Sequence, residues 1–252
     1  MDLHIQGKIA LVTGASKGIG AAVAAGLAQE GVTLVMNARG KDALEAKAAH
    51  IRQTTGAEVI AIASDVASSE GIAALFDALG DKQPDILVAN AGGPPAGQAA
   101  TLSEDQWAAG YDLTLMSPVR LAYAVLPTMR ERGWGRIINI TSLSVREPVA
   151  NLTLSNAYRA AVTGFAKTLS TEIISQGITV NNVGPGYTDT ERLNELFADD
   201  SAKTAFTANI PAKRLATPAE VAAAAVFLAS QQAAYITGQT VMVDGGALRG
   251  VN

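Results

Sequence analysis

Closely spaced glycines near the amino terminus are the clearest chemical signal in the sequence. The segment Thr13 to Gly20 reads Thr-Gly-Ala-Ser-Lys-Gly-Ile-Gly and separates an apolar run from an Ala-rich stretch. Glycine lets a backbone approach a pyrophosphate closely, and the N-terminus of a following helix offers it unpaired N–H donors. A simple structural turn is the alternative, but the position after a first strand favours dinucleotide binding. The residues expected to bind it are Gly14, Ser16, Lys17, Gly18, Ile19 and Gly20.

The segment Val35 to Arg39 indicates which nicotinamide dinucleotide would bind. A site for NAD(H) usually places Asp or Glu about 20 residues after the glycines, where it holds the ribose 2′-OH. This segment has no carboxylate, whereas Arg39 can make a planar, charge-assisted contact with a 2′-phosphate, and Lys17 could add a second cation. We therefore expect NADP(H) rather than NAD(H), the alternative being that both cations are solvated surface charges. Asp65 and Val66 suit a contact to the adenine edge, although Asp65 could equally be a helix N-cap.

Composition limits the other chemistry open to this chain. Its 252 residues include no cysteine and two histidines, His4 and His50, which argues against thiol chemistry, a metal site and a Ser-His-Asp hydrolase. The net charge of −4 argues against a large nucleic-acid footprint. The apolar stretch Val221 to Ala229 is too short to span a bilayer, and no basic segment followed by an apolar one begins the chain. We expect a soluble, cytoplasmic protein.

Strand-like apolar runs alternate with Ala-rich helical stretches along the whole chain, as in βαβ units with a parallel sheet. We expect one domain over residues 1–252, with a polar insertion at about 188–209 that acts as a substrate lid. Pro118 is expected to bend the long fourth helix. The expected strands are Ile9–Thr13, Thr33–Asn37, Val59–Ala63, Ile86–Ala89, Arg136–Ile140, Thr179–Val183 and Thr240–Val243, and the expected helices are Gly18–Gln29, Lys41–Thr54, Ser69–Leu79, Ser103–Arg132, Leu152–Ser175 and Pro218–Ala229.

Further motifs occur in an order that resembles the short-chain dehydrogenase/reductase family over essentially the whole chain. They follow the glycine turn as Asn90-Ala91-Gly92, Ile140-Thr141-Ser142, Pro185-Gly186, Tyr235-Ile236-Thr237-Gly238 and Val243-Asp244-Gly245-Gly246. The resemblance implies a doubly wound Rossmann sheet of about seven strands in a three-layer α/β/α fold, assembled as a homotetramer or homodimer. It also implies that Asn90, Ala91 and Gly92 border the adenosine ribose, and that Pro185, Gly186 and Thr188 hold the nicotinamide carboxamide.

The catalytic pattern that the resemblance implies is only partly present. Members of the family typically use a Ser, a Tyr-x-x-x-Lys pair and an Asn on the preceding long helix. Ser142 matches the Ser, although it could instead cap the end of a strand. Counting back from the matching segment Gly164 to Leu169 places Ser155 at the Tyr position and Arg159 at the Lys position, while Thr114 stands at the Asn position. Three of the four expected groups therefore differ.

Helical geometry suggests a replacement for the missing phenol. At about 100° per residue, Ser155 and Arg159 lie within about 40° of each other, and Tyr158 lies about 60° to the other side of Ser155. Serine is a much poorer acid than phenol, and arginine stays charged and cannot shuttle a proton. We hypothesise that Ser142 and Arg159 polarise the substrate oxygen while Tyr158 or a relayed water supplies the proton. Helix packing or a subunit contact is the alternative role of Tyr158.

These residues predict an NADP(H)-dependent oxidoreductase that reduces a ketone or 3-oxoacyl group of a small molecule. Loss of a positioned general acid costs roughly 10²- to 10⁴-fold in rate, so the disrupted pair also permits other hypotheses. One is a nucleotide-binding sensor or inactive subunit with little turnover. Another is a reductase of an activated C=C bond, for which a phenol at the usual position need not be essential.

Overall fold

A seven-stranded parallel sheet forms the centre of the molecule. The computed structural model describes residues 1–195, 197 and 199–250. Every paired neighbour in the sheet runs parallel, in the order β3-β2-β1-β4-β5-β6-β7. This is the expected doubly wound fold, with its topological switch between β1 and β4. The strands are β1 (Ile9–Val12), β2 (Thr33–Ala38), β3 (Val59–Ala63), β4 (Ile86–Ala89), β5 (Gly135–Ile140), β6 (Ile178–Pro185) and β7 (Thr240–Val243).

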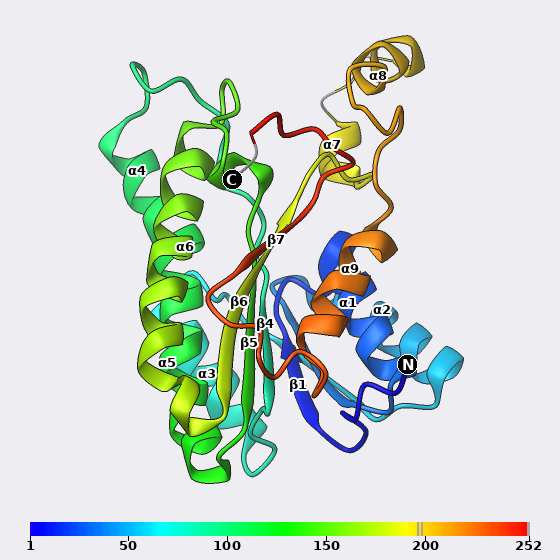
Figure 1. Cartoon of the computed structure of the whole chain (residues 1–252), viewed down its shortest axis with the longest axis vertical. Coiled ribbons are helices and arrows are strands. Elements are labelled where there is room, and N and C mark those ends of the chain that lie inside the picture. The colour runs from blue at the N-terminus through cyan, green and yellow to red at the C-terminus, as the bar shows by residue number, and fades with distance from the viewer. Residues whose placement is uncertain (196, 198, 251–252) are drawn as a thin grey trace.

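Helices cover both faces of the sheet and complete three layers (Figure 1). One face is covered by α1 (Gly18–Gln29), α2 (Lys41–Thr55) and α9 (Pro218–Leu228). The other is covered by α3 (Ser69–Leu79), α5 (Ser117–Arg132) and α6 (Thr153–Ile173). Because both faces of the sheet are covered, most of the strands read as continuous apolar runs.

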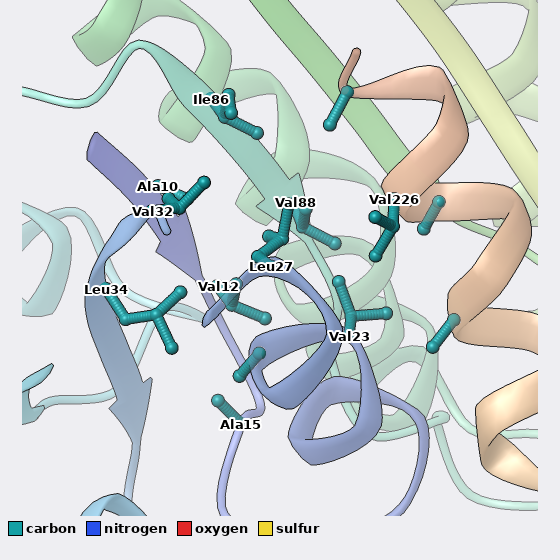
Figure 2. Close-up of a cluster of buried hydrophobic side chains, with 14 of the residues drawn as sticks. Ala10, Val12, Ala15, Val23, Leu27, Val32, Leu34, Ile86, Val88 and Val226 are labelled. Carbon is teal, nitrogen blue, oxygen red and sulfur yellow. The ribbon is translucent and has the colours of Figure 1, made fainter. Parts of the chain in front are cut away.

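Apolar packing fixes α1 beneath the glycine turn. Val23 and Leu27 of α1 lie among Val12 and Val88 of the sheet and Val226 of α9 (Figure 2). Each of these side chains is at least nine-tenths buried, and burial of one such side chain stabilises the fold by roughly 1.5–3 kcal/mol. The N-terminus of α1 is thereby held at the carboxyl end of β1.

The long helix expected over Ser103–Arg132 is present as an unbroken helical run from Glu104 to Arg132, but it consists of three consecutive segments rather than one regular α-helix. They are α4 (Glu104–Gly110), a π-helical segment η1 (Tyr111–Met116), and α5. Pro118 sits in the first turn of α5, directly after η1 and with helical backbone before it. The bend expected at Pro118 stays a prediction. Gly110 precedes η1 and lies against Leu154 and Tyr158 of α6, where a Cβ would approach both side chains to 3.2 Å.

Two short helices follow β6 above the carboxyl ends of the strands (Figure 1). They are α7 (Glu191–Asn194) and α8 (Asp200–Thr207), and they lie within the expected lid at 188–209. Residues 196 and 198 of that segment lie outside the described residues. Within the described ranges, no helix is both long and apolar enough to cross a membrane.

Candidate functional site

One cleft runs along the carboxyl ends of the strands. It is lined by the glycine turn, by the segments that follow β2, β3, β4, β5 and β6, and by residues of α6 and α7. Its volume is about 1790 Å³, larger than the roughly 300–1,000 Å³ of an ordinary ligand pocket. The cleft therefore has room for a dinucleotide together with a second small molecule.

The glycine turn forms one end of the cleft. Gly14 and Gly18 both have φ of +58°, and a Cβ on Gly20 would lie 2.3 Å from the Gly14 carbonyl oxygen, so the turn requires glycine. The Asn90 side-chain amide donates to the carbonyl oxygens of Thr13 and Gly14, both at 3.2 Å, and so fixes the turn against β4. No side chain of the described residues caps the start of α1, which leaves its first amides able to receive an anion.

Arg39 and Lys17 differ in what they contact. Arg39 follows β2, lines the cleft and is exposed, and within the described residues it forms no ion pair. The Lys17 ammonium instead pairs with Glu191 of α7, and the hydrogen bond and charge of that carboxylate raise the pKa of Lys17. Of the two expected cations, Arg39 is therefore the one left without a carboxylate partner.

Asp65 and Val66 both line the cleft after β3. The alternative that Asp65 is a helix N-cap is wrong, because Ser68 caps α3 by accepting a hydrogen bond from the Gly71 amide at 3.0 Å. Asp65 instead accepts from the Ala67 amide at 3.0 Å, which is a local turn of the backbone.

Ser142, Ser155 and Arg159 line the other end of the cleft together. Arg159 Nε donates to Ser155 Oγ at 3.2 Å, and Arg159 Nη1 donates to the Ile140 carbonyl oxygen at 2.8 Å. Ser142 Oγ accepts from the Ser144 amide at 3.1 Å, so it caps the short turn after β5 and still has its own proton to donate. Burial, and secondly the charge of Arg192, lower the pKa of Arg159 to about 10, which leaves it a cation at neutral pH.

Tyr158 is directed away from this cleft. Its hydroxyl donates to the Trp107 carbonyl oxygen at 3.0 Å, and its ring packs edge-on against Trp107 and Tyr111 at centroid distances of 5.6 and 6.1 Å. Burial raises the pKa of Tyr158 above its ordinary value, so the phenol is also a weaker acid. Tyr158 is not among the described residues that line the cleft, and the structure does not bring it to Ser142 and Arg159.

Thr114 does not line the cleft but lies behind the part that Ser142, Ser155 and Arg159 line. It belongs to η1 and lines a separate cavity of about 20 Å³ together with Asn139 and Arg159. Thr114 Oγ1 is buried with no hydrogen-bond partner among the described residues. A cavity of this size has room for about one water molecule, which would need such polar partners.

The remaining expected cofactor residues occupy the rim of the same cleft. Ala91, Gly92, Pro185, Gly186 and Thr188 all line it, together with Ser16 and Ile19. The Thr188 hydroxyl donates to the Gly186 carbonyl oxygen at 3.3 Å, and its side chain is buried. The next threonine, Thr190, was not expected at the site, yet its methyl lies within 3.4 Å of where a Gly18 Cβ would be.

Three aromatic residues that sequence reasoning missed, within or directly before the segment 188–209, complete the wall of the cleft. Tyr187 and Phe206 pack edge-on with ring centroids 4.7 Å apart, and Phe197 lies 5.3 Å from Phe206. All three line the cleft, as does Arg192. The signal available in the sequence was the clustering of aromatic side chains within an otherwise polar insertion, but only the fold shows that they converge.

Comparisons with known proteins agree with this geometry. A family model described as enoyl-(acyl carrier protein) reductase matches residues 14–247. The 3-oxoacyl-(acyl-carrier-protein) reductase FabG of Vibrio harveyi is 39% identical over 246 residues, which are 97% of this chain and 98% of that relative. The crystal structure of L-sorbose reductase from Gluconobacter frateurii with NADPH and L-sorbose matches with a TM-score of 0.95 and 36% identity, over 100% of both chains.

A further solved structure extends the likeness. YwfH, an NADPH-dependent reductase involved in bacilysin biosynthesis, matches with a TM-score of 0.94 and 30% identity, over 98% of this chain and 100% of the other. Sequence motifs, sheet order, cleft and relatives thus agree. The chain belongs to the short-chain dehydrogenase/reductase family of nicotinamide-dependent oxidoreductases.

Proposed function

We propose that the protein is an NADP(H)-dependent reductase of a ketone or 3-oxoacyl group. The observation that carries this proposal is that a single cleft joins the glycine turn and Arg39 at one end to Ser142 and Arg159 at the other. The glycine turn and Arg39 suit a phosphorylated dinucleotide. Ser142 and Arg159 suit a substrate oxygen that gains negative charge.

Arg39 supports the choice of NADP(H). Its guanidinium lies at the cleft without an ion-pair partner among the described residues, where it can bind a 2′-phosphate through parallel N–H bonds. The second strand carries no carboxylate that would select the free ribose hydroxyl. The L-sorbose reductase and YwfH structures both name NADPH, which supports the same choice.

Ser142 and Arg159 are the groups proposed to act on the substrate oxygen. The nicotinamide, when bound, supplies the hydride, and negative charge then develops on the carbonyl oxygen. The Ser142 hydroxyl and the Arg159 guanidinium stabilise this charge by hydrogen bonding, in the manner of an oxyanion hole. The bonds from Arg159 to Ile140 and Ser155 hold its guanidinium in place before substrate arrives.

The proton in this proposal comes from water rather than from a side chain. Arg159 stays protonated at neutral pH, and Ser155 is too weak an acid to donate. Tyr158 is bonded to the Trp107 carbonyl instead. A water in the cleft, hydrogen-bonded to Ser142 or Ser155, is therefore proposed to relay a proton from bulk solvent to the substrate oxygen, and the solvent replaces the proton that the water gives up.

Calorimetry and NADPH oxidation together test the proposal. We expect the protein to bind NADPH more tightly than NADH and to oxidise NADPH with at least one member of a panel of ketones and 3-oxoacyl thioesters. Ser142→Ala should lower kcat by roughly 10²- to 10³-fold with NADPH affinity unchanged, because it removes an oxyanion donor. Oxidation with enoyl thioesters alone would replace carbonyl reduction with reduction of a C=C bond.

A second candidate is a nucleotide-binding protein with little turnover. The position of Tyr158 favours it, since the phenol nearest the family's proton-donor position is turned toward α4. Tight NADPH binding without oxidation on any compound of the panel would select this candidate over the reductase.

A further inference from the structure

Two guanidinium groups from different elements line the catalytic end of the cleft. Arg159 is on α6, and Arg192 reaches in from α7 of the lid. Arg192 Nη1 and Nη2 donate to the carbonyl oxygens of Gly93 and Pro94 at 2.7 and 2.9 Å, in the loop that follows β4. The two charges are close enough that Arg192 helps to lower the pKa of Arg159.

Neither guanidinium has a carboxylate partner within the described part of the chain. Arg159 and Arg192 donate to carbonyl oxygens and to the Ser155 hydroxyl, and the ion pairs observed involve other residues. The acidic side chains of the lid that line the cleft are already paired, Asp189 with Lys203 at 3.1 Å and Glu191 with Lys17. This end of the cleft therefore carries uncompensated positive charge.

Unbonded donors remain on Arg192. A guanidinium has five N–H donors, and the two carbonyl bonds leave Nε and part of each Nη available. Like charges side by side cost free energy, and that cost is recovered when an anion binds between them. A carboxylate or a phosphate matches the planar fork of arginine.

We propose that Arg192 binds an anionic group of the substrate, a carboxylate or a phosphate, beside the carbonyl that Arg159 polarises. This inference rests on the proposed reductase function and specifies its substrate class. The aromatic side chains of Tyr187, Phe197 and Phe206 form the apolar wall of the cleft and are proposed to contact the uncharged part of the substrate.

Matched pairs of neutral and anionic ligands test the proposal without turnover. The probes are 3-oxobutanoate, 3-oxohexanoate and 3-oxooctanoate against their methyl esters, and dihydroxyacetone phosphate against dihydroxyacetone. Each is titrated by calorimetry into the protein with and without NADP⁺, which cannot deliver a hydride. We expect the anion of at least one pair to bind about tenfold or more tightly than its neutral partner, with a preference that falls as salt is raised. The acid and phosphate pairs distinguish the two anions.

Arg192→Gln and Lys213→Gln form a matched pair of variants. Both remove one positive charge from the segment after β6, but Lys213 is not among the described residues that line the cleft and pairs with no carboxylate among them. We expect Arg192→Gln to reduce the anion preference about tenfold, which corresponds to 1.4 kcal/mol, and Lys213→Gln to leave it unchanged.

Equal binding of anionic and neutral partners in every pair overturns the proposal, as does absence of binding by all of them. It is also overturned if Arg192→Gln weakens NADP⁺ binding about tenfold and leaves the anion preference intact, because the guanidinium then serves the cofactor. The direct titration with NADP⁺ is a separate measurement, and failure there contradicts the NADP(H) assignment instead.

Discussion

At the scale of single residues, the hydrogen bond of Tyr158 defines its role. The hydroxyl is bonded to the Trp107 carbonyl at 3.0 Å, so Tyr158→Phe should leave kcat unchanged. Loss of this bond should lower the free energy of unfolding by about 1 kcal/mol. Steady-state NADPH oxidation and urea denaturation measure the two effects. A tenfold fall in kcat with stability intact would place the phenol in the reaction after all.

Ser155 and Arg159 allow the family's usual pair to be rebuilt. Both line the cleft and are hydrogen-bonded to each other, so Ser155→Tyr with Arg159→Lys places a phenol beside an ammonium. A positioned general acid contributes roughly 10²- to 10⁴-fold, and we expect kcat to rise within that range. Ser155→Tyr alone is the control, since arginine remains beside the phenol. If the double variant folds and binds NADPH but its kcat is unchanged, the lack of a side-chain proton donor does not limit the rate of the wild type.

The residue pairs differ in how far the sequence could predict them. Ser155 and Arg159 are four residues apart on one helix, so a helical wheel sufficed to place them together. The contact of Tyr158 with Trp107 joins residues 51 apart and depends on how α4 packs against α6, which no local pattern contains. The ion pair of Lys17 with Glu191 could not be predicted either, because it also joins residues far apart in the sequence.

At the scale of elements, the N-terminal cap of α9 should make the stability of the fold depend on pH. Because α9 packs on α1, this dependence concerns the helix that follows the glycine turn. Thr217 and Glu220 form a capping box, and Arg214 pairs with the Glu220 carboxylate at 2.6 Å. The side-chain bond with Arg214, followed by the Thr217 amide, lowers the pKa of Glu220 from 4.5 to about 2. Because the folded pKa is depressed, this stabilisation is fully present above about pH 4.5 and is lost as the pH falls toward 2.

Urea denaturation of the wild type and Glu220→Gln between pH 7 and 3 tests this dependence. The wild type should lose its stability advantage over the variant as the pH falls through this range. Parallel pH profiles for the two proteins would contradict it. Since α9 packs on α1, we also expect loosening of this cap to appear in hydrogen exchange of α1.

Regular elements were predicted well where capping and apolar runs define them. Helices α1 and α3 and strands β3, β4 and β7 begin and end at the expected residues. Between Ser103 and Arg132 the expected helix is present, but the sequence did not predict that the hydrogen bonding changes to the π-helical pattern in η1. The π-helical segment η1 lies against α6, a tertiary contact that the periodicity does not encode.

At the scale of the whole molecule, Arg39 should set how strongly each cofactor stabilises the fold. At a free NADPH concentration 100 times its Kd, the free energy of unfolding should rise by about 2.7 kcal/mol. Arg39→Gln should weaken NADPH binding about tenfold or more and leave NADH binding unchanged, because only the 2′-phosphate loses a partner. Thermal unfolding with each dinucleotide measures the difference. If Arg39→Gln weakened NADPH and NADH binding equally, Arg39 would not contact the 2′-phosphate.

The segment that follows β6 contacts both ends of the cleft. Glu191 pairs with Lys17 in the glycine turn, while the adjacent Arg192 holds the loop after β4. Two neighbouring side chains on one turn of helix thus bridge the places proposed for the two reactants. If binding of the dinucleotide changes the affinity for substrate through these contacts, thermodynamic linkage requires the reverse effect as well. Binding of substrate must then change the affinity for the dinucleotide by the same factor. Glu191→Gln removes the ion pair with Lys17. It should therefore bring the factor by which each ligand changes the affinity for the other closer to one.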